Sequence, residues 1–381
     1  MMGYSRVSIL VTVLALFGWG LALGETTAGT NAQDRLFGAD KIAQIEIEVD
    51  AEGLHKLQAA PQSYVAAVVR VDGQEFRSAE VRLKGHGSFQ PITGKPNFMV
   101  RLDQGSAGKQ AFGHKRLLLD NSSQDRSFLR WKLASELFLK AKLPAARVNF
   151  AQVKLNGRAL GPYLLVEPTD KVFLQEQFGS ATGNLYEGSN TDVEDKLELD
   201  SGHASGTQPE LKALASACRE PDRKRRWIRL QKVLEVDRFA SFMAMEVLIC
   251  HHDGYSLDRN NYRIYHNPKT DRMAFIPHGM DLIFDRPDLP LDGGWGGTVA
   301  RAFMETPEGR SKYIQRVAEL AKLAYGSDDL EKRIESLSGF LRASGIGQVP
   351  AELEASIAEL QKSVRRRKEF VGEEVARLGG Q

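Results

Sequence analysis

Three side chains that carry oxygen ligands occur in the stretch HHDGYSLDRNNYRIYHNPKTDRMAFIPHGMD, residues 251–281: Asp253, Asn261 and Asp281. Carboxylate and amide oxygens are the ligands that Mg²⁺ prefers in proteins. A carboxylate beside the ion can also accept the proton of a hydroxyl group. These residue types predict a divalent metal site with Asp253 as a base. The plainer alternative is a polar turn, in which Asp253 and Asn261 only cap neighbouring backbone.

The same stretch predicts a hairpin that positions these side chains. The segments YRIYH and MAFIP are strand-like, and NPKTD between them is typical of a turn. A turn at the centre of NPKTD pairs Tyr262 with Pro277, so Asn261 and Asp281 follow at one end of the hairpin. The order Asp, Asn, hairpin, Asp is the one that protein kinases use, where the first Asp orients the attacking hydroxyl and the other two ligands hold Mg²⁺ on the phosphates.

Histidines in this region offer zinc binding as an alternative. They are His251, His252, His266 and His278. Adjacent histidines rarely point in one direction, and the spaced pair of known zinc motifs is missing. The interpretation with oxygen ligands is therefore favoured.

A glycine loop flanked by two lysines precedes this stretch. LKGHGSFQPITGKPNFMVRL contains Lys84, Gly85-x-Gly87 and Lys95. Glycines let backbone amides approach phosphate, and a lysine can pair with phosphate oxygens. The alternative is an ordinary glycine-rich hairpin tip. The sequence has no G-x-x-x-x-G-K-[ST], which argues against a P-loop enzyme.

Two glutamates are further candidates for the cofactor site. Glu136 lies on a predicted amphipathic helix and is expected to pair with one of the two lysines, as helix glutamates do in kinases. Glu167 ends the predicted strand GPYLLVEP at the junction of two lobes, where an adenine can hydrogen-bond to the backbone. The plainer alternatives are a surface glutamate and a buried strand.

The elements that must position these residues predict an α+β fold. Residues 41–170 read as a mostly antiparallel β lobe, with hairpin turns at Asp72-Gly73 and Asn156-Gly157 and one helix in FLRWKLASELFLKA. Residues 171–381 read as a mainly helical lobe, in which 189–222 is dominated by loops. LQKVLEVDRFASFMAMEVLI predicts one amphipathic helix that leads into the HHDG loop.

Composition narrows the possible partners and the compartment. The chain has 381 residues, a formal net charge of +2 and 26% charged residues, so no basic field indicates nucleic acid. The run Arg223–Arg226 is local and typical of a solvated helix, with phosphate or a membrane surface as the minor alternative. Two cysteines, Cys218 and Cys250, allow one disulfide or two buried thiols.

The first residues predict export. Arg6 precedes an apolar run from Val7 to Leu23, and small residues end at Gly24, which together are typical of a signal peptide over residues 1–24. An uncleaved anchor is the alternative, and only then is membrane attachment expected. Residues 25–40 read as a linker. The body of the protein is therefore expected in the periplasm, in the cell envelope or outside the cell.

Taken in order, these segments resemble the spore coat protein H (CotH) kinase family, a group of secreted or envelope proteins with an atypical, two-lobed, kinase-like fold. The segments that carry the resemblance are VRLKGHGS, KPNFMVRL, LLLDNSSQDRSFLRWKLASELF, VKLNGRALGPYLLVEPTDKVFL, GNLYEG, HHDGYSLDRNNYRIYHNP and MAFIPHGMD. The resemblance implies transfer of a phosphoryl group from ATP, with Mg²⁺ or Mn²⁺, to Ser or Thr of an exported protein.

Carried over by position, the resemblance assigns roles to the candidate residues. Asp253 looks like the catalytic Asp, and Asn261 and Asp281 look like the metal ligands. Lys95 looks like the lysine that binds phosphate, with Lys84 as its rival. The remaining cofactor contacts that it implies are Glu136 and Glu167.

Two departures from the family pattern put activity in question. Where the family often has Pro-Trp-Asp-x-Asp, this chain has PHGMD, so Gly279 replaces a carboxylate, for which Asp285 is a possible substitute. The loop from Asp253 to Asn261 is also longer than usual, which can bring Asp258 into the site.

These observations favour an exported atypical Ser/Thr protein kinase. A catalytically weak, kinase-like binding or scaffold protein of the cell envelope is the second hypothesis, suggested by Gly279 and by the scarcity of ATP outside the cytoplasm. A metal-dependent hydrolase that uses the same site is the third.

Overall fold

The computed structural model describes residues 34–38, 40–85, 87–102, 113–203, 206–345 and 350–379. The predicted signal peptide, residues 1–24, lies outside the described residues, as does most of the predicted linker, residues 25–40. The described end of that linker is structured, because Asp34–Phe37 forms helix α1. Leu36 and Phe37 are buried in the core of the N-terminal lobe, so this segment belongs to the folded domain.

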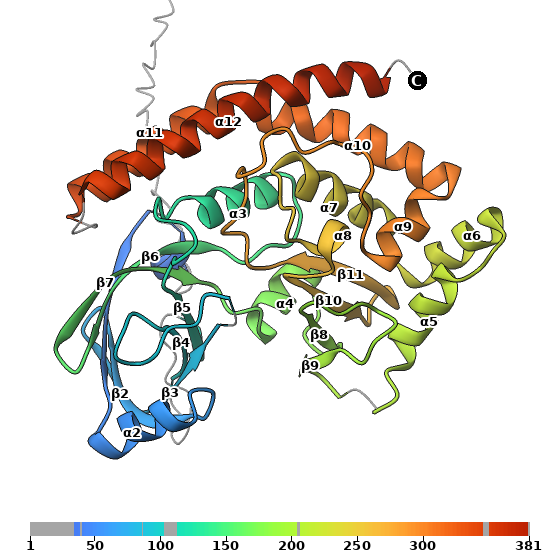
Figure 1. Ribbon diagram of the computed structural model, residues 1–381. Helices are drawn as coiled ribbons and strands as arrows, with labels where there is room; N and C mark the ends of the chain where they lie inside the picture. The colour runs from blue at the N-terminus through green and yellow to red at the C-terminus, as the bar shows by residue number, and fades with distance from the viewer. Residues whose placement is uncertain are drawn as a thin grey trace, which may run out of the picture.

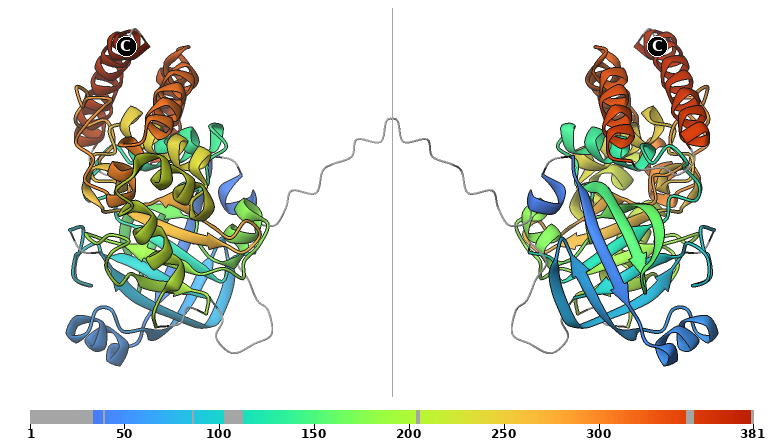
Figure 2. Two further views of the ribbon diagram at one scale, coloured as in Figure 1. Left: turned by 90° about the vertical axis from the view of Figure 1, so that its right-hand side faces the viewer. Right: turned by 90° about the vertical axis from the view of Figure 1, so that its left-hand side faces the viewer.

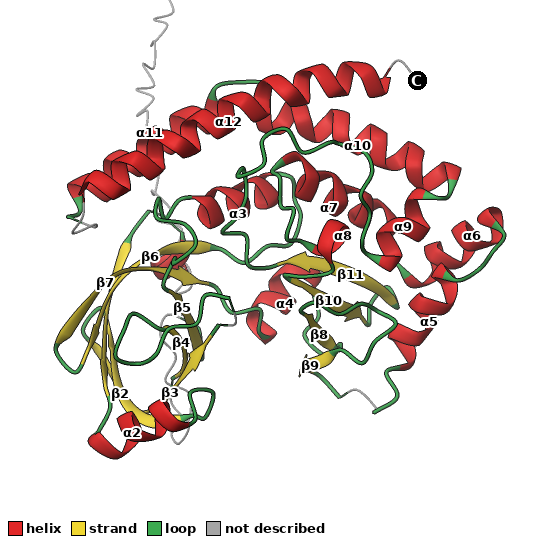
Figure 3. Cartoon of the chain, viewed as in Figure 1, coloured by secondary structure: helices red, strands yellow, loops and turns green. Residues whose placement is uncertain are grey.

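The N-terminal lobe is a β-barrel (Figures 1 and 3). Its strands are β1 (Ile42–Glu48), β2 (Val65–Val71), β3 (Gln74–Lys84), β4 (Asn97–Arg101), β5 (Arg116–Asp120), β6 (Val148–Leu155) and β7 (Arg158–Val166). In the part of the chain that the structure describes, they pair in the order β1-β2-β3-β4-β5-β7-β6. Most pairs are antiparallel, as predicted, but β1 closes the barrel by pairing with β6 in parallel. Closure leaves none of these seven described strands as an open edge of the barrel.

Turn chemistry explains the two predicted hairpins, and both are confirmed. Asp72 and Gly73 have φ angles of 49° and 83°, and Asn156 and Gly157 have φ angles of 48° and 79°. Positive φ at both central residues is the type I′ geometry, whose twist matches that of the flanking strands. The hairpins β2–β3 and β6–β7 therefore form where local sequence alone places them.

Two helices accompany the barrel: α2 (Ala51–Ala59) and α3 (Arg130–Lys140). Helix α3 lies between the barrel and the helical lobe. Toward the barrel, Ser135 donates a hydrogen bond of 2.6 Å to the carbonyl of Ala146. Toward the helical lobe, the ring of Phe138 lies 6.2 Å from that of Phe242. The helix thus fixes the two lobes relative to each other.

The C-terminal lobe combines helices with a small sheet (Figures 1 and 2). Its strands are β8 (Leu185–Gly188), β9 (Glu198–Ser201), β10 (Tyr262–Asn267) and β11 (Arg272–Pro277), in the order β11-β10-β8-β9. Its helices are α4 (Lys171–Phe178), α5 (Pro209–Cys218), α6 (Arg223–Val233), α7 (Val236–Leu248), α8 (Tyr255–Asp258), α9 (Thr298–Met304), α10 (Pro307–Tyr325), α11 (Asp329–Ala343) and α12 (Pro350–Gly379). Together with the barrel, these elements confirm the predicted α+β, two-lobed fold class.

The helix predicted for residues 230–249 is interrupted in the structure. Helix α6 ends at Val233, and α7 begins at Val236. Between them, Glu235 donates its amide to the carbonyl of Met273 on β11 (3.0 Å), which takes the chain out of helical geometry. The apolar periodicity is similar on both sides of the break, so only the contact with β11 reveals it. Residues 189–222 are likewise more ordered than predicted, since they contain β9 and α5.

Both cysteines are buried free thiols in separate elements of the C-terminal lobe. Cys218 ends α5, and Cys250 follows α7. Burial raises the pKa of each thiol to about 12, so both are protonated at neutral pH. Among the helices of the described residues, none combines the length and the apolar character required to cross a membrane.

Candidate active site

The hairpin β10–β11 has the predicted register. Tyr262 lies opposite Pro277, and the amide of His278 donates a hydrogen bond of 2.9 Å to the carbonyl of Asn261. Gly279 follows with a φ of 54°, a left-handed conformation that favours glycine. A Cβ atom on Gly279 would lie 2.5 Å from Asn261 Oδ1. The space that a carboxylate side chain at position 279 would need is thus occupied by Asn261.

Asp253 lies on the loop between α7 and α8 and is held by two amides. Asn260 Nδ2 donates to its Oδ1 (2.9 Å), and Asn261 Nδ2 donates to its Oδ2 (2.7 Å). Because both oxygens have a fixed donor, the orientation of the half-buried carboxylate is set before any ligand binds. This arrangement brings Asp253 and Asn261 together as the sequence predicted.

A buried glutamate anchors the loop that carries Asp253. Glu246 on α7 accepts hydrogen bonds from the amides of Tyr255 (3.1 Å) and Ser256 (3.0 Å) and from the Ser256 hydroxyl. A Cβ atom on Gly254 would collide with the Glu246 carboxylate, so a glycine is required there. Burial raises the pKa of Glu246 to about 8. This residue was not predicted, because a lone glutamate on an apolar helix forms no motif.

Asp281 lies just beyond the hairpin and is largely buried, with 8% of its surface exposed. Burial, followed by the negative charge of Asp120, raises the pKa of its carboxyl to about 7. Asp125 and Asp253 raise that pKa further. A cation bound at Asp281 would offset this accumulation of negative charge.

A cavity of about 440 Å³ between the lobes joins these residues. It is lined from the C-terminal lobe by Asp253, Asn261, His278, Gly279 and Asp281, and from the barrel lobe by Lys84, Gly85, Gly87, Ser88 and Asp120, among others. The glycine loop and the predicted metal ligands thus face one space, although they are distant in sequence. The three positions on which the metal prediction depends are neither scattered nor turned away from it.

Lys84 is the predicted lysine that faces the cavity. Its Nζ lies 3.4 Å from His278 Nε2 and 4.0 Å from Glu187 Oε1. Burial lowers the pKa of Lys84, and Glu187 opposes that change. Arg263 and Lys84 hold the pKa of Glu187 well below its usual range, so this carboxylate is ionised. Lys84 is therefore placed between the barrel and a fixed carboxylate of the C-terminal lobe.

Lys95 is directed away from the cavity. Its Nζ donates to the carbonyl of Asn121 (2.9 Å) and lies 4.9 Å and 5.0 Å from the ring centroids of Phe128 and Tyr163. Burial lowers the pKa of Lys95 to about 8. Lys95 is not among the residues that line the cavity, so the geometry favours Lys84, its rival, as the phosphate-binding lysine.

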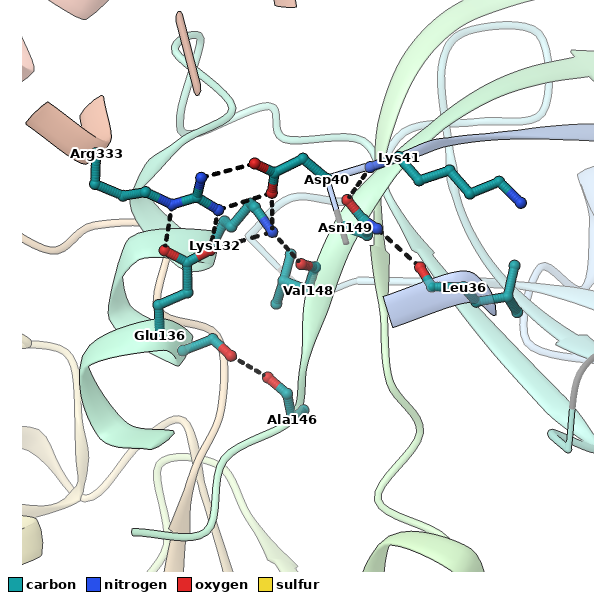
Figure 4. A network of polar contacts seen from close by, with 10 residues as sticks. Leu36, Asp40, Lys41, Lys132, Glu136, Ala146, Val148, Asn149 and Arg333 are labelled. Atoms are coloured by element: carbon teal, nitrogen blue, oxygen red, sulfur yellow. Dashed lines mark hydrogen bonds and ion pairs between the residues drawn. The ribbon is translucent and has the colours of Figure 1, made fainter. Parts of the chain in front are cut away.

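Glu136 does not pair with either lysine, which corrects the prediction. Figure 4 shows its carboxylate facing Arg333 of α11, with distances of 2.8 Å and 2.7 Å to Nε and Nη2. Lys132 and Asp40 complete this network between α3, α11 and the start of β1. Helix α3 presents Glu136 to the helical lobe because its other face packs on β6. Glu187 occupies the place beside Lys84 instead.

Glu167 follows β7 and lines a second hollow of about 360 Å³, which shares Lys84 and Glu187 with the first. Its carboxylate accepts hydrogen bonds from the amide (2.9 Å) and Nε (3.0 Å) of Arg147. The Glu167 carboxylate is thus already bonded within the protein. The residue nevertheless lies beside the cavity, where the adenine was predicted. Asp285, the suggested substitute for the carboxylate missing at 279, is paired with His252 (3.0 Å). Asp258, which the longer loop was expected to bring into the site, is not among the residues that line this cavity; it lines another hollow, together with Asp253.

The described residues contain no group of three His, Cys, Asp or Glu side chains placed to hold a metal ion. The alternative zinc site therefore has no support among them: His266, for example, contacts Asp271. A cation at Asp281 would need the Asn261 amide, water and phosphate oxygens as further ligands. Mg²⁺ commonly keeps water and phosphate ligands of this kind, so the donor set fits that ion.

The barrel lobe, the helical lobe and the charged cavity between them define a kinase-like protein. The chain belongs to the CotH kinase family, since the family model described as CotH kinase protein matches residues 81–374. This match confirms the resemblance inferred from the motifs.

Two relatives are similar at low identity. Inner spore coat protein H of Bacillus subtilis is 24% identical over 189 residues, which are 46% of this chain and 51% of that protein. Invasin CotH2 of Rhizopus delemar is 19% identical over 270 residues, which are 62% of this chain and 46% of that protein. The chain thus spans about half the length of each relative.

Among solved structures, HipA of Shewanella oneidensis MR-1, in a complex with HipB and operator DNA, is similar with a TM-score of 0.38 and 12% identity. The alignment covers 89% of this chain and 76% of that chain. A likeness at this TM-score supports no conclusion about the present protein.

Proposed function

We propose that this chain is a protein kinase that transfers the γ-phosphoryl group of ATP to a Ser or Thr hydroxyl, with Mg²⁺ or Mn²⁺ as cofactor. The observation that carries the proposal is the single cavity lined by Lys84, Asp253, Asn261 and Asp281. A lysine, an oriented carboxylate and two oxygen ligands are the groups that phosphoryl transfer requires.

Each residue has a role that follows from its contacts. Asp253, held by two amides, accepts the proton of the attacking hydroxyl. Lys84 pairs with phosphate oxygens, and Gly85 and Gly87 give those oxygens access to backbone amides. Asn261 and Asp281 would hold the cation, which when bound neutralises negative charge on the phosphates.

The second hollow is the proposed place for the adenine. It adjoins the cavity at Lys84, and it is lined by Glu167, Pro168 and Thr169 just after β7. Because Arg147 occupies the Glu167 carboxylate, recognition of the base is assigned to the backbone of this segment.

A third hollow of about 580 Å³ supports a place for the acceptor protein. Asp253 lines it together with His252, Leu257 and Arg286, among others. Asp253 therefore borders both a cavity for the nucleotide and a separate space open to a second substrate. A base that serves transfer between two substrates must lie between them.

The acceptor is proposed to be a protein of the cell envelope or a secreted protein. The predicted signal peptide supports this assignment, as do relatives that are named a spore coat protein and an invasin. Nucleic acid is not proposed as a partner, and membrane attachment is proposed only if the N-terminal segment stays uncleaved.

A second candidate function is a kinase-like binding protein with little transferase activity. The observation that favours it is Gly279, because the carboxylate that the family often has there is missing. Such a protein would bind nucleotide without transferring phosphate.

One experiment separates these functions. The purified mature protein is incubated with γ-labelled ATP and Mg²⁺ or Mn²⁺, beside Asp253→Ala and Asp281→Ala. Label on protein that is lost in both variants supports the kinase. Thermal stabilisation by ATP without label supports the binding protein. Release of phosphate from other esters, with no labelled protein, would instead indicate a hydrolase.

A further inference from the structure

Asp281 is a buried carboxylate without a side-chain partner among the described residues. It lines the cavity with 8% of its surface exposed. Its side chain makes no hydrogen bond or ion pair with another residue in the part of the chain that the structure describes. Burial penalises the ionised form of an unpaired carboxylate, and a bound cation would offset that penalty.

Asp120 faces the same cavity from the opposite lobe. It is the last residue of β5, and Oδ1 accepts a hydrogen bond of 2.8 Å from the amide of Ser122. No ion pair within 4 Å is found for it among the described residues, although Lys84 also lines the cavity. Asp120 is the charged group that acts most strongly on Asp281. The two carboxylates thus line one cavity from opposite lobes.

Two neighbouring carboxylates, in contrast, accept several hydrogen bonds from other residues. Asp125 is committed to the turn before α3, where it accepts hydrogen bonds from the Ser127 hydroxyl and from the amides of Ser127 (3.0 Å) and Arg130 (2.9 Å). Both oxygens of Asp253 are occupied by amides of Asn260 and Asn261. Among these four carboxylates, Asp120 and Asp281 therefore have the fewest side-chain contacts with other described residues.

We propose that Asp120 and Asp281 form a carboxylate pair that binds the divalent cation from both lobes. The inference rests on the proposed function and adds a ligand to it. Two carboxylates repel each other in a cavity, but each attracts a cation that lies between them, so a bound cation offsets the repulsion. Asn261 Nδ2 donates to Asp253, which leaves its Oδ1 for the same ion. Two carboxylates, one amide oxygen and water suit Mg²⁺ or Mn²⁺.

This pair explains how the site can dispense with a carboxylate at position 279. In the family pattern, both acidic residues come from the segment after the hairpin. Here a side chain at 279 would collide with Asn261, whereas β5 ends at the cavity and delivers Asp120 from the barrel. A cation shared in this way also joins the two lobes across the cleft.

The test measures Mn²⁺ binding in the absence of nucleotide, by the electron paramagnetic resonance signal of free Mn²⁺. The wild type, Asp120→Asn, Asp281→Asn and the charge-matched control Glu80→Gln are compared. Asparagine at 120 can still accept the hydrogen bond from Ser122, so the turn is retained. Glu80 is a half-buried residue of β3 paired with Arg101 outside this cavity. Circular dichroism in EDTA checks that each variant is folded.

We expect Asp120→Asn and Asp281→Asn each to weaken Mn²⁺ binding at least tenfold, and Glu80→Gln to leave it unchanged. Loss of binding in Asp281→Asn with wild-type affinity in Asp120→Asn would overturn the pair and leave the proposed kinase intact. Failure of the wild type to bind Mn²⁺, with or without ATP, would overturn both. If Asp120→Asn does not fold, Asp120→Ser is measured by the same criterion.

Discussion

The side-chain amide of Asn261 donates a hydrogen bond of 2.7 Å to the carboxylate of Asp253. The nitrogen of Asn261 thus orients the carboxylate of the proposed base, and its side-chain oxygen takes no part in that bond. Asn260 holds the other oxygen of Asp253 at 2.9 Å. Two residues of its own loop therefore position the Asp253 carboxylate.

Removal of the base should abolish transfer and spare nucleotide binding. We expect Asp253→Ala to lower label transfer from γ-labelled ATP by about 10²–10⁴-fold, the usual range for a general base. Stabilisation by ATP and Mg²⁺ should persist, because Lys84 and Asp281 remain. Transfer at the wild-type rate would exclude Asp253 as the base.

The two lysines should respond differently to the same substitution. Lys84→Met should weaken ATP binding about tenfold or more, since a charge-assisted hydrogen bond contributes about 1.5–3 kcal/mol. Lys95→Met should leave ATP binding unchanged and lower the free energy of unfolding by about 1–3 kcal/mol, through loss of the bond to Asn121 and the contacts with two rings. Isothermal titration with ATP and urea unfolding measure the two effects. Weaker ATP binding in Lys95→Met, with unchanged binding in Lys84→Met, would instead identify Lys95 as the phosphate-binding residue.

Glu187 and Glu136 should also differ in how the same substitution affects the KM for ATP. Glu187→Gln should raise the KM for ATP about tenfold, because Lys84 loses the fixed charge beside it and 1.4 kcal/mol corresponds to a factor of ten. Glu136→Gln should leave that KM unchanged and lower stability by about 1 kcal/mol, because only the network with Arg333 is weakened. Initial rates at varied ATP concentration provide the comparison. An effect of Glu136→Gln on KM would mean that α3 contacts the nucleotide site after all.

Gly279 should be intolerant of any side chain. We expect Gly279→Ala to cost about 1–2 kcal/mol of stability from the positive φ alone. It should also reduce Mn²⁺ affinity, because the new Cβ must displace Asn261 Oδ1. Thermal unfolding and Mn²⁺ titration check both effects. Gly73→Ala, at a hairpin tip with positive φ and nothing within 4 Å, controls for backbone strain. If Gly279→Ala binds Mn²⁺ as tightly as Gly73→Ala, the contact with Asn261 is unimportant.

The buried Glu246 should make stability fall as pH rises. Burial raises its pKa to about 8 in the folded protein, although hydrogen bonds from Ser256 and Tyr255 oppose that shift. Between its ordinary pKa of about 4.3 and the folded value, the unfolded chain releases a proton that the folded chain keeps, so the free energy of unfolding decreases by at most about 5 kcal/mol across that window.

Urea unfolding at pH 5.5, 6.5, 7.5 and 8.5 tests this expectation. Glu246→Gln removes the titrating group and should flatten the pH dependence relative to the wild type. The control is Glu52→Gln on α2, an exposed glutamate of the barrel lobe, whose slope should match the wild type. Equal slopes for wild type and Glu246→Gln would show that Glu246 is ionised throughout.

Features that depend on neighbours in the chain were predictable. The turn NPKTD fixed the register of β10 and β11, and Tyr262 faces Pro277 as expected. The positive φ angles at Asp72-Gly73 and Asn156-Gly157 agree with the turns predicted for those residues. The break between α6 and α7 was missed because Glu235 leaves the helix to bond with Met273, a residue remote in sequence.

Within the site, the sequence by itself determined which residue types gather on the hairpin and its preceding loop: an Asp, an Asn and a second Asp, in an order set by local turns. Tertiary structure alone decided that Lys84 and not Lys95 faces the cavity, that Glu187 and not Glu136 lies beside Lys84, and that Asp120 and Asp281 line the cavity from opposite lobes. The reason is physical. Turn geometry acts over a few residues, whereas closure of the barrel by β1 and β6 and the packing of α3 between the lobes join residues far apart in the chain, and no local pattern encodes which side chain such packing turns toward the cavity.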